Sequence, residues 1–184
     1  MAIIDSPNAL QTPPSFWNTV LRYGGISALA GVVISLLFYL LDFNMMSFSG
    51  MAIQFIVAFG ISVTIAALAI KYQRDNFDGG YIGYGRALLI GLLVILVGSL
   101  GSSVWNYILI NFIDPGYVDN LKEKFIETWG ENMPAENLEE ALVGFDKAGD
   151  ILTILKNGII GGLVVGLITG LIAAGIMKRD RPVL

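Results

Sequence analysis

The chain has 184 residues, of which 55% are hydrophobic and only 14% are charged, and its formal net charge is −4. Soluble domains carry a smaller apolar share and about 25% charged residues, so this composition indicates a membrane protein. The sequence contains no Cys and no His. This excludes disulfides, thiolate nucleophiles and zinc, iron or haem sites built on imidazole, and we expect no metal or other cofactor.

Four apolar runs span residues of about 19–41, 51–70, 87–112 and 151–177. A hydrocarbon layer of about 30 Å needs about 20 helical residues at about 1.5 Å each, so each run is long enough to cross it. The sequence therefore predicts an all-α fold, a four-helix transmembrane bundle that forms a single membrane domain over residues 1–184. The centres of the runs hold no Asp, Glu, Lys or Arg, which disfavours proton relays and ion-coupled transport.

The segment 114–150 between the third and fourth runs is the only sizeable part outside them. Apolar residues recur there at helical spacing in two sets, first Val118, Leu121, Phe125 and Trp129, then Leu138, Leu142 and Phe145. The spacing predicts a short amphipathic helical insert of two helices, which would lie on the bilayer or cap the bundle.

Orientation follows from the distribution of Lys and Arg. Seven of these residues fall on the side of the two termini and four on the other side, which favours cytoplasmic termini. Acidic residues divide as four and eleven, so the expected net charges are +3 inside and −7 outside.

Two stretches carry a resemblance. The first holds Arg74-Asp75, Gly79-Gly80-Tyr81-Ile82 and Tyr84-Gly85-Arg86-Ala87, and the second is Asn111-Phe112-Ile113-Asp114-Pro115, followed by an acidic insert. This pattern resembles a bacterial family of small four-helix inner-membrane proteins that is defined as a domain of unknown function. The resemblance implies a bacterial cytoplasmic (inner) membrane, and it supplies no activity, substrate or catalytic residue.

Small residues form rows on two of the predicted helices. In the fourth run they are Gly158, Gly162, Gly166 and Gly170 at a four-residue spacing, and in the first run they are Ser27, Gly31 and Ser35. Such rows allow close approach of membrane helices. We expect packing within the bundle, with the row of the first helix as the partner, and a homodimer face is the alternative.

Polar side chains gather towards the outer ends of the runs: Tyr39, Gln54, Ser102, Ser103, Asn106 and Asn157. Interhelical hydrogen bonds are the favoured interpretation, at under about 1 to 2 kcal/mol each. The alternative is an outward-facing pocket lined by Gln54, Asn106 and Asn157.

No motif in the sequence predicts a reaction, and we expect no catalytic residue and no enzymatic activity. The leading hypothesis is an accessory or scaffolding subunit of a membrane assembly. Its alternative is a small transporter or binder of an uncharged or lipid-like solute. The expected surroundings are the lipid bilayer, with other membrane-protein subunits or a second copy as candidate partners, and no nucleic acid.

Overall fold

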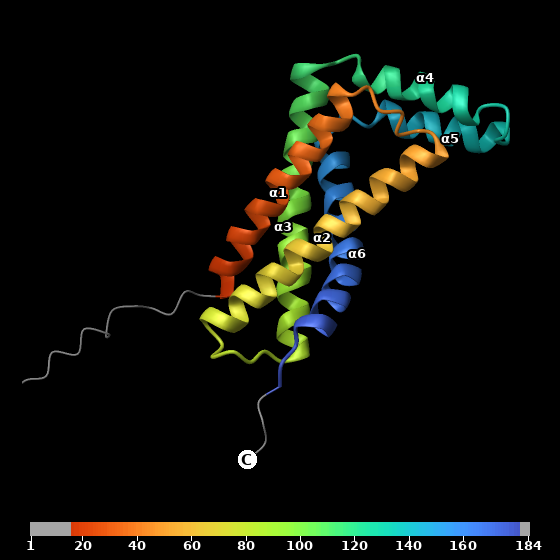
Figure 1. Ribbon diagram of the computed structural model, residues 1–184. Coiled ribbons are helices and arrows are strands. Elements are labelled where there is room, and N and C mark those ends of the chain that lie inside the picture. The colour runs from red at the N-terminus through yellow and green to blue at the C-terminus, as the bar shows by residue number, and fades with distance from the viewer. Residues whose placement is uncertain (1–15, 181–184) are drawn as a thin grey trace, which may run out of the picture.

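The computed structural model describes residues 16–180, and these residues form helices joined by short connections (Figure 1). The elements in chain order are α1 (Phe16–Leu40), α2 (Phe48–Asn76), α3 (Tyr84–Ile108), the π-helical segment η1 (Leu109–Ile113), α4 (Tyr117–Trp129), α5 (Ala135–Asp146) and α6 (Ile151–Met177). Four of these stretches are long and apolar enough to cross a membrane: α1, α2, α3 with η1, and α6. The predicted all-α fold, with two short helices between the third and fourth spans, is confirmed.

Helix boundaries differ from the prediction mainly in α2. We expected a span of 51–70 followed by a loop, but the helix begins at Phe48 and continues to Asn76. At its start Ser47 caps the helix, since its hydroxyl accepts a hydrogen bond from the Gly50 N–H at 3.1 Å. At its end Lys71 and Arg74 remain helical because long basic side chains reach polar surroundings from an apolar stem.

The third span ends in a π-helical turn. The Asp114 N–H donates to the Leu109 carbonyl at 2.8 Å, which is an i to i−5 hydrogen bond. Pro115 follows and cannot continue a helix. The run predicted for residues 87–112 stops one residue before this end, and its π geometry was not predicted.

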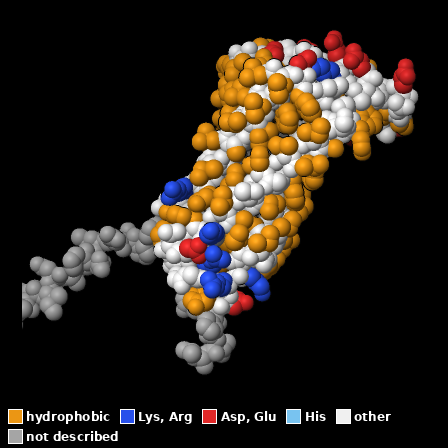
Figure 2. Space-filling view, viewed as in Figure 1, with side chains coloured by type: hydrophobic (Ala, Val, Ile, Leu, Met, Phe, Trp, Pro, Cys, Tyr) orange, Lys and Arg blue, Asp and Glu red, His pale blue; other side chains and the backbone are white. Residues whose placement is uncertain are grey.

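The two ends of the bundle differ in charge. At one end α1 begins, α2 turns into α3 and α6 finishes (Figure 1). We call it the basic end, because its described residues include six Lys or Arg against three Asp. At the other, the hairpin end, α4 and α5 project sideways from the bundle, and Figure 2 shows acidic side chains along them and basic ones at the opposite end.

Helix α3 lies between α1 and α6 and packs closely on both. A Cβ atom added at Gly91 would lie 2.9 Å from Gly170 Cα of α6, and one added at Gly101 would lie 2.5 Å from Ala28 Cβ of α1. The expectation that the small-residue rows of α1 and α6 face each other is therefore wrong. Both rows lie against α3, which carries small residues of its own for each neighbour.

The apolar core occupies the basic half of the bundle. Its buried members come from the second half of α2, the first half of α3 and the end of α6, and include Ile65, Ile70, Ile90, Val94 and Ala173. Fewer residues are buried towards the hairpin end, and neither α4 nor α5 contains a buried residue. The bundle is thus tightly closed at one end only.

Candidate functional site

The opening at the hairpin end is produced by the course of α2. Its second half packs into the core through Ile65, Ala66 and Ala69. Its first half runs away from α1 and α3 (Figure 1), and Phe55, Ile56 and Val57 are 62%, 68% and 37% exposed. Three consecutive helical positions point in three directions, so this half of α2 is uncovered over most of its circumference, apart from the face of the buried Gly50 and the half-buried Gln54.

A cleft of about 550 Å³ lies beside the middle of α2, where Ala58, Ile61 and Ser62 line it. Its floor is α3, its sides are α1 and α6, and Gly144 and Ala148 close it at the hairpin end. Ligand pockets commonly have volumes of about 300 to 1,000 Å³, so the cleft is large enough for a small molecule or part of a lipid.

The side chains that line the cleft are mostly apolar, and the polar ones among them are uncharged. Ile34, Ile61 and Val165 contribute to the walls, and none of the lining residues is charged. Two of the serine hydroxyls already donate hydrogen bonds within the protein. Ser99 Oγ donates to the Gly158 carbonyl at 2.9 Å, and Ser103 Oγ donates to the Ser99 carbonyl at 2.8 Å. The cleft therefore disfavours ions and suits an uncharged molecule.

Asn106 and Asn157 supply the carboxamide groups of the cleft. They come from α3 and α6, and both are exposed. Among the hydrogen bonds formed by residues 16–180, none involves either carboxamide. A polar group left without a partner in hydrocarbon costs several kcal/mol, so a ligand or water that pairs with these groups is favoured there.

Part of the predicted polar cluster meets in this cleft. Ser102, Ser103, Asn106 and Asn157 line it, whereas Gln54 does not. Tyr39 lies apart, since its hydroxyl donates to Asp114 Oδ2 at 3.2 Å.

The predicted packing residues divide in a similar way between the cleft and α3. Ser27, Gly31, Gly158 and Gly162 belong to the lining, while Gly166 and Gly170 lie deeper, against α3. Ser35 accepts a hydrogen bond from Trp105 Nε1 at 3.3 Å.

Several lining residues were missed by the sequence analysis. Gly98 and Ser99 form much of the floor, and Ser62 and Gly161 lie on α2 and α6. The cluster of small residues between positions 98 and 103 was the available signal for the floor. No signal in the sequence indicated that α2 diverges.

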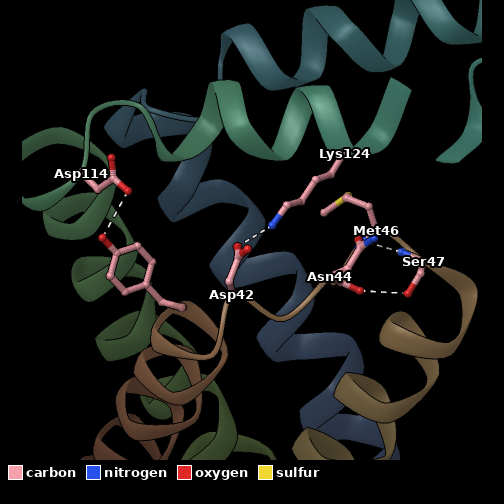
Figure 3. Close-up of polar contacts among 7 residues, drawn as sticks. Asp42, Asn44, Met46, Ser47, Asp114 and Lys124 are labelled. Carbon is pink, nitrogen blue, oxygen red and sulfur yellow. Dashed lines mark hydrogen bonds and ion pairs between the residues drawn. The ribbon is translucent and has the colours of Figure 1, made fainter. Parts of the chain in front are cut away.

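A polar network fastens the hairpin to the connection between α1 and α2 (Figure 3). Lys124 Nζ of α4 pairs with the carboxylate of Asp42, and Trp129 Nε1 donates to the Met46 carbonyl at 2.8 Å. Asn44 Oδ1 accepts from the Met46 N–H at 3.0 Å and fixes the turn that leads into α2. The hairpin thereby holds the chain at the point where α2 starts.

The end of α1 explains the position of Asp42. Its φ of 48° is left-handed, and the Phe43 N–H donates to the Phe38 carbonyl at 3.0 Å. This is a Schellman helix end, and the rings of Phe38 and Phe43 supply its apolar contact with centroids 5.0 Å apart. The left-handed residue is usually Gly, but here an Asp directs its carboxylate to Lys124.

Tyr117 lies beside the same network, outside the spans. Its ring centroid is 5.6 Å from that of Tyr39. Burial raises the pKa of the Tyr117 hydroxyl, and the nearby Asp114 carboxylate and then Tyr39 raise it further. The group therefore stays neutral at physiological pH.

The basic end is fastened by a second network. Thr19 Oγ1 donates to Gln73 Oε1 at 2.6 Å, and Arg74 Nη1 donates to the Met177 carbonyl at 3.1 Å. Ile82 and Arg179 form an isolated antiparallel bridge, which joins the connection between α2 and α3 to the chain after α6. These bonds secure the second half of α2.

A second cavity of about 460 Å³ lies at this end. Arg86 and Arg179 line it together with Asp78 and Asp180, and Arg86 Nη2 already pairs with Asp78 Oδ1 at 2.9 Å. Its charges balance, so it favours neither an anion nor a cation. Within residues 16–180, no group of three Asp or Glu side chains is placed to hold a metal ion.

Comparison with known proteins gives one relationship. The sequence model of a family described as "Protein of unknown function (DUF4199)" matches residues 22–179. No curated protein and no solved structure matches the chain.

Proposed function

The chain belongs to the DUF4199 family of proteins of unknown function, and we propose that it is a non-enzymatic protein that binds an uncharged, lipid-like molecule in its cleft. The observation that carries this proposal is the pair of carboxamides, Asn106 and Asn157, which bond to no residue among 16–180 and lie in a neutral cleft of about 550 Å³. A molecule with a hydroxyl or carbonyl group and an apolar chain complements both parts of the lining. Such a molecule would enter from the surrounding lipid.

We place the protein in a bacterial cytoplasmic membrane with its basic end inside. The excess of Lys and Arg at that end supports this orientation. The cleft then opens in the outer half of the bilayer, beneath the acidic hairpin. Its ligand would come from the outer leaflet.

Two glycines of α6 provide a matched test of binding. Gly161 lines the cleft and Gly175 does not, and a Cβ atom added at either would meet nothing within 4 Å. Gly161→Leu should therefore fill part of the cleft without disturbing helix packing. Gly175→Leu is the control for the added bulk.

The probe is dioleoylglycerol, and bound copies are counted by native mass spectrometry. We expect Gly161→Leu to weaken binding about fivefold or more, because forcing extra atoms into an occupied site costs about 1 to 3 kcal/mol. Gly175→Leu should bind like the unmodified chain. Equal binding by the two variants would contradict the proposal, and equal affinity for anionic dioleoyl phosphatidylglycerol would contradict selection by charge.

A second candidate is an accessory or scaffolding subunit of a membrane assembly. The first half of α2 favours it, because a helix exposed over most of its circumference offers an unusually large surface to another membrane protein. Purification in mild detergent tests this candidate. Consistent isolation of the chain alone would remove its support.

A further inference from the structure

Helix α2 consists of two halves that differ in how firmly they are held. The second half is buried in the core and bonded through Gln73 and Arg74 to α1 and to the end of α6. From Met51 to Ala58 the first half is exposed, apart from the half-buried Gln54. The change occurs between Ala58 and Ile65.

Three residues at the boundary between the two halves of α2 are of types that weaken or bend a helix. Ser62 Oγ donates to the Ala58 carbonyl at 2.7 Å, and Thr64 Oγ1 donates to the Gly60 carbonyl at 2.8 Å. Bonds of this kind to the carbonyl four residues earlier often bend helices. Gly60 adds backbone freedom, and packing does not require it, since an added Cβ atom would meet nothing within 4 Å.

The far end of the exposed half is held by the hairpin and by the short connection to α1, in which the Phe43 N–H donates to the Phe38 carbonyl. Trp129 and Lys124 contact the Met46 carbonyl and Asp42, immediately before α2 begins. No residue of α4 or α5 is buried, so the hairpin grips this connection through a few polar bonds rather than through a core. Interactions of this kind open at low cost.

We propose that the first half of α2 is a lateral gate to the cleft, which pivots at Gly60–Thr64 and is held open by the α4–α5 hairpin acting as a strut. The proposal rests on the cleft being the binding site. Ala58, in the moving half, belongs to the cleft lining together with Ser62 of the pivot, so a swing of this half changes the shape of the cleft. A bend of about 20° at Gly60 moves Met51, about 13 Å along the helix, by about 5 Å.

Distances between two spin labels test the gate. The chain has no native Cys, so Met51→Cys on α2 and Val104→Cys on α3 give one labelled pair at exposed positions. Double electron–electron resonance in lipid nanodiscs reports the distance distribution. Removing the strut by Trp129→Phe with Lys124→Gln should shorten the mean distance by about 5 Å, the displacement expected for such a bend.

Stiffening the pivot supplies the opposite change. Gly60→Ala with Ser62→Ala and Thr64→Ala removes both bending bonds and favours a straight helix, so the distribution should narrow. Gly175→Ala is the control and should leave it unchanged. Distributions that are the same in the strut, pivot and control variants would overturn the gate.

The two proposals fail in different ways. If the distances stay fixed while Gly161→Leu still loses dioleoylglycerol, the cleft binds its ligand but α2 is not a gate. If the distances shift as expected while dioleoylglycerol binding is the same in every variant, α2 moves but the cleft is not the binding site, and the inference falls with the proposed function.

Discussion

Glycines on the two sides of α6 serve different purposes, although the sequence presents them as one glycine-rich helix. Gly166 is buried, and a Cβ atom added there would lie 2.9 Å from the carbonyl oxygen of Leu92, a backbone atom that cannot rotate away. Gly175 faces open space. The first is needed for the approach of α3, and the second is not.

Gly166→Ala should therefore destabilise the protein, and Gly175→Ala should not. We expect a loss of about 1 to 3 kcal/mol for the first, because the helices must separate. For the second we expect no loss, since Ala is the better helix former. Thermal unfolding in detergent measures both, and a lower midpoint for Gly175→Ala than for Gly166→Ala would contradict the packing described above.

Asp150 controls how the start of α6 responds to pH. The Thr153 N–H and hydroxyl both donate to its Oδ2 at 2.8 Å, and these bonds lower the pKa of the carboxyl below its ordinary value of 3.8. A lowered pKa means that folding favours the charged form. The stabilisation is therefore complete above that ordinary value and is lost as the pH falls through the folded-state pKa.

The variant Asp150→Asn keeps an acceptor at the helix start but carries no charge. We expect its thermal midpoint to lie below that of the unmodified chain at pH 7. The difference should shrink as the pH falls below about 4, where the carboxyl of the unfolded chain is protonated first, and should vanish below the lower pKa of the folded state. A difference that stays constant from pH 7 to pH 3 would show that the charge of Asp150 does not matter.

Among the elements, the four membrane spans were predictable from the sequence, but which helices pack against each other was not. Hydropathy identified all four long helices. Inside lipid there is no water to pair with backbone N–H and C=O groups, so a crossing segment must be a helix and appears as a long apolar run. The row Gly158–Gly170 showed which face of α6 packs, but a row of small residues fits any helix that offers a matching surface. That surface is α3, whose small residues Gly91, Ser99 and Ser103 we did not treat as a packing face.

The candidate site was predictable only in part, for a related reason. Asn106 and Asn157 were assigned to one polar cluster because residues at the same depth in the membrane lie side by side on antiparallel helices. Gln54 has a similar depth but is absent from the lining. The path of α2 decides this, and it depends on tertiary contacts at both ends of the helix that hydropathy does not contain.

The hairpin is expected to open without unfolding the bundle. The rings of Phe125 and Phe145 lie 5.4 Å apart and join α4 to α5, yet neither helix has a buried residue. Phe125→Ala should speed amide hydrogen exchange throughout residues 117–146 and leave exchange in α3 unchanged. The exposed Ile126→Ala is the control, and faster exchange in α3 after Phe125→Ala would show that the two parts unfold together.

For the whole molecule, the separation of charge predicts which end faces the cytoplasm. Asn132 lies between the hairpin helices and Asp180 follows α6, so single cysteines at these sites mark opposite ends of a chain without native Cys. A membrane-impermeant maleimide added to intact bacterial cells should label Asn132→Cys and spare Asp180→Cys. Reversed labelling would place the basic end outside, and equal labelling would contradict the crossing of the membrane by α6.

The central place of α3 also sets the order in which the molecule can be completed. Helix α1 precedes α3 in the chain and covers one side of it, whereas α6 is synthesised later than any other described helix. A partly made chain thus carries the side of α3 that holds Gly91, Ser99 and Ser103 before α6 is there to cover it. If membrane proteases recognise this incomplete bundle, residues 1–148 expressed alone should be degraded quickly. In a pulse-chase experiment, their lifetime should lengthen when residues 149–184 are supplied as a second chain. Equal lifetimes would mean that the uncovered helix is not what membrane quality control detects.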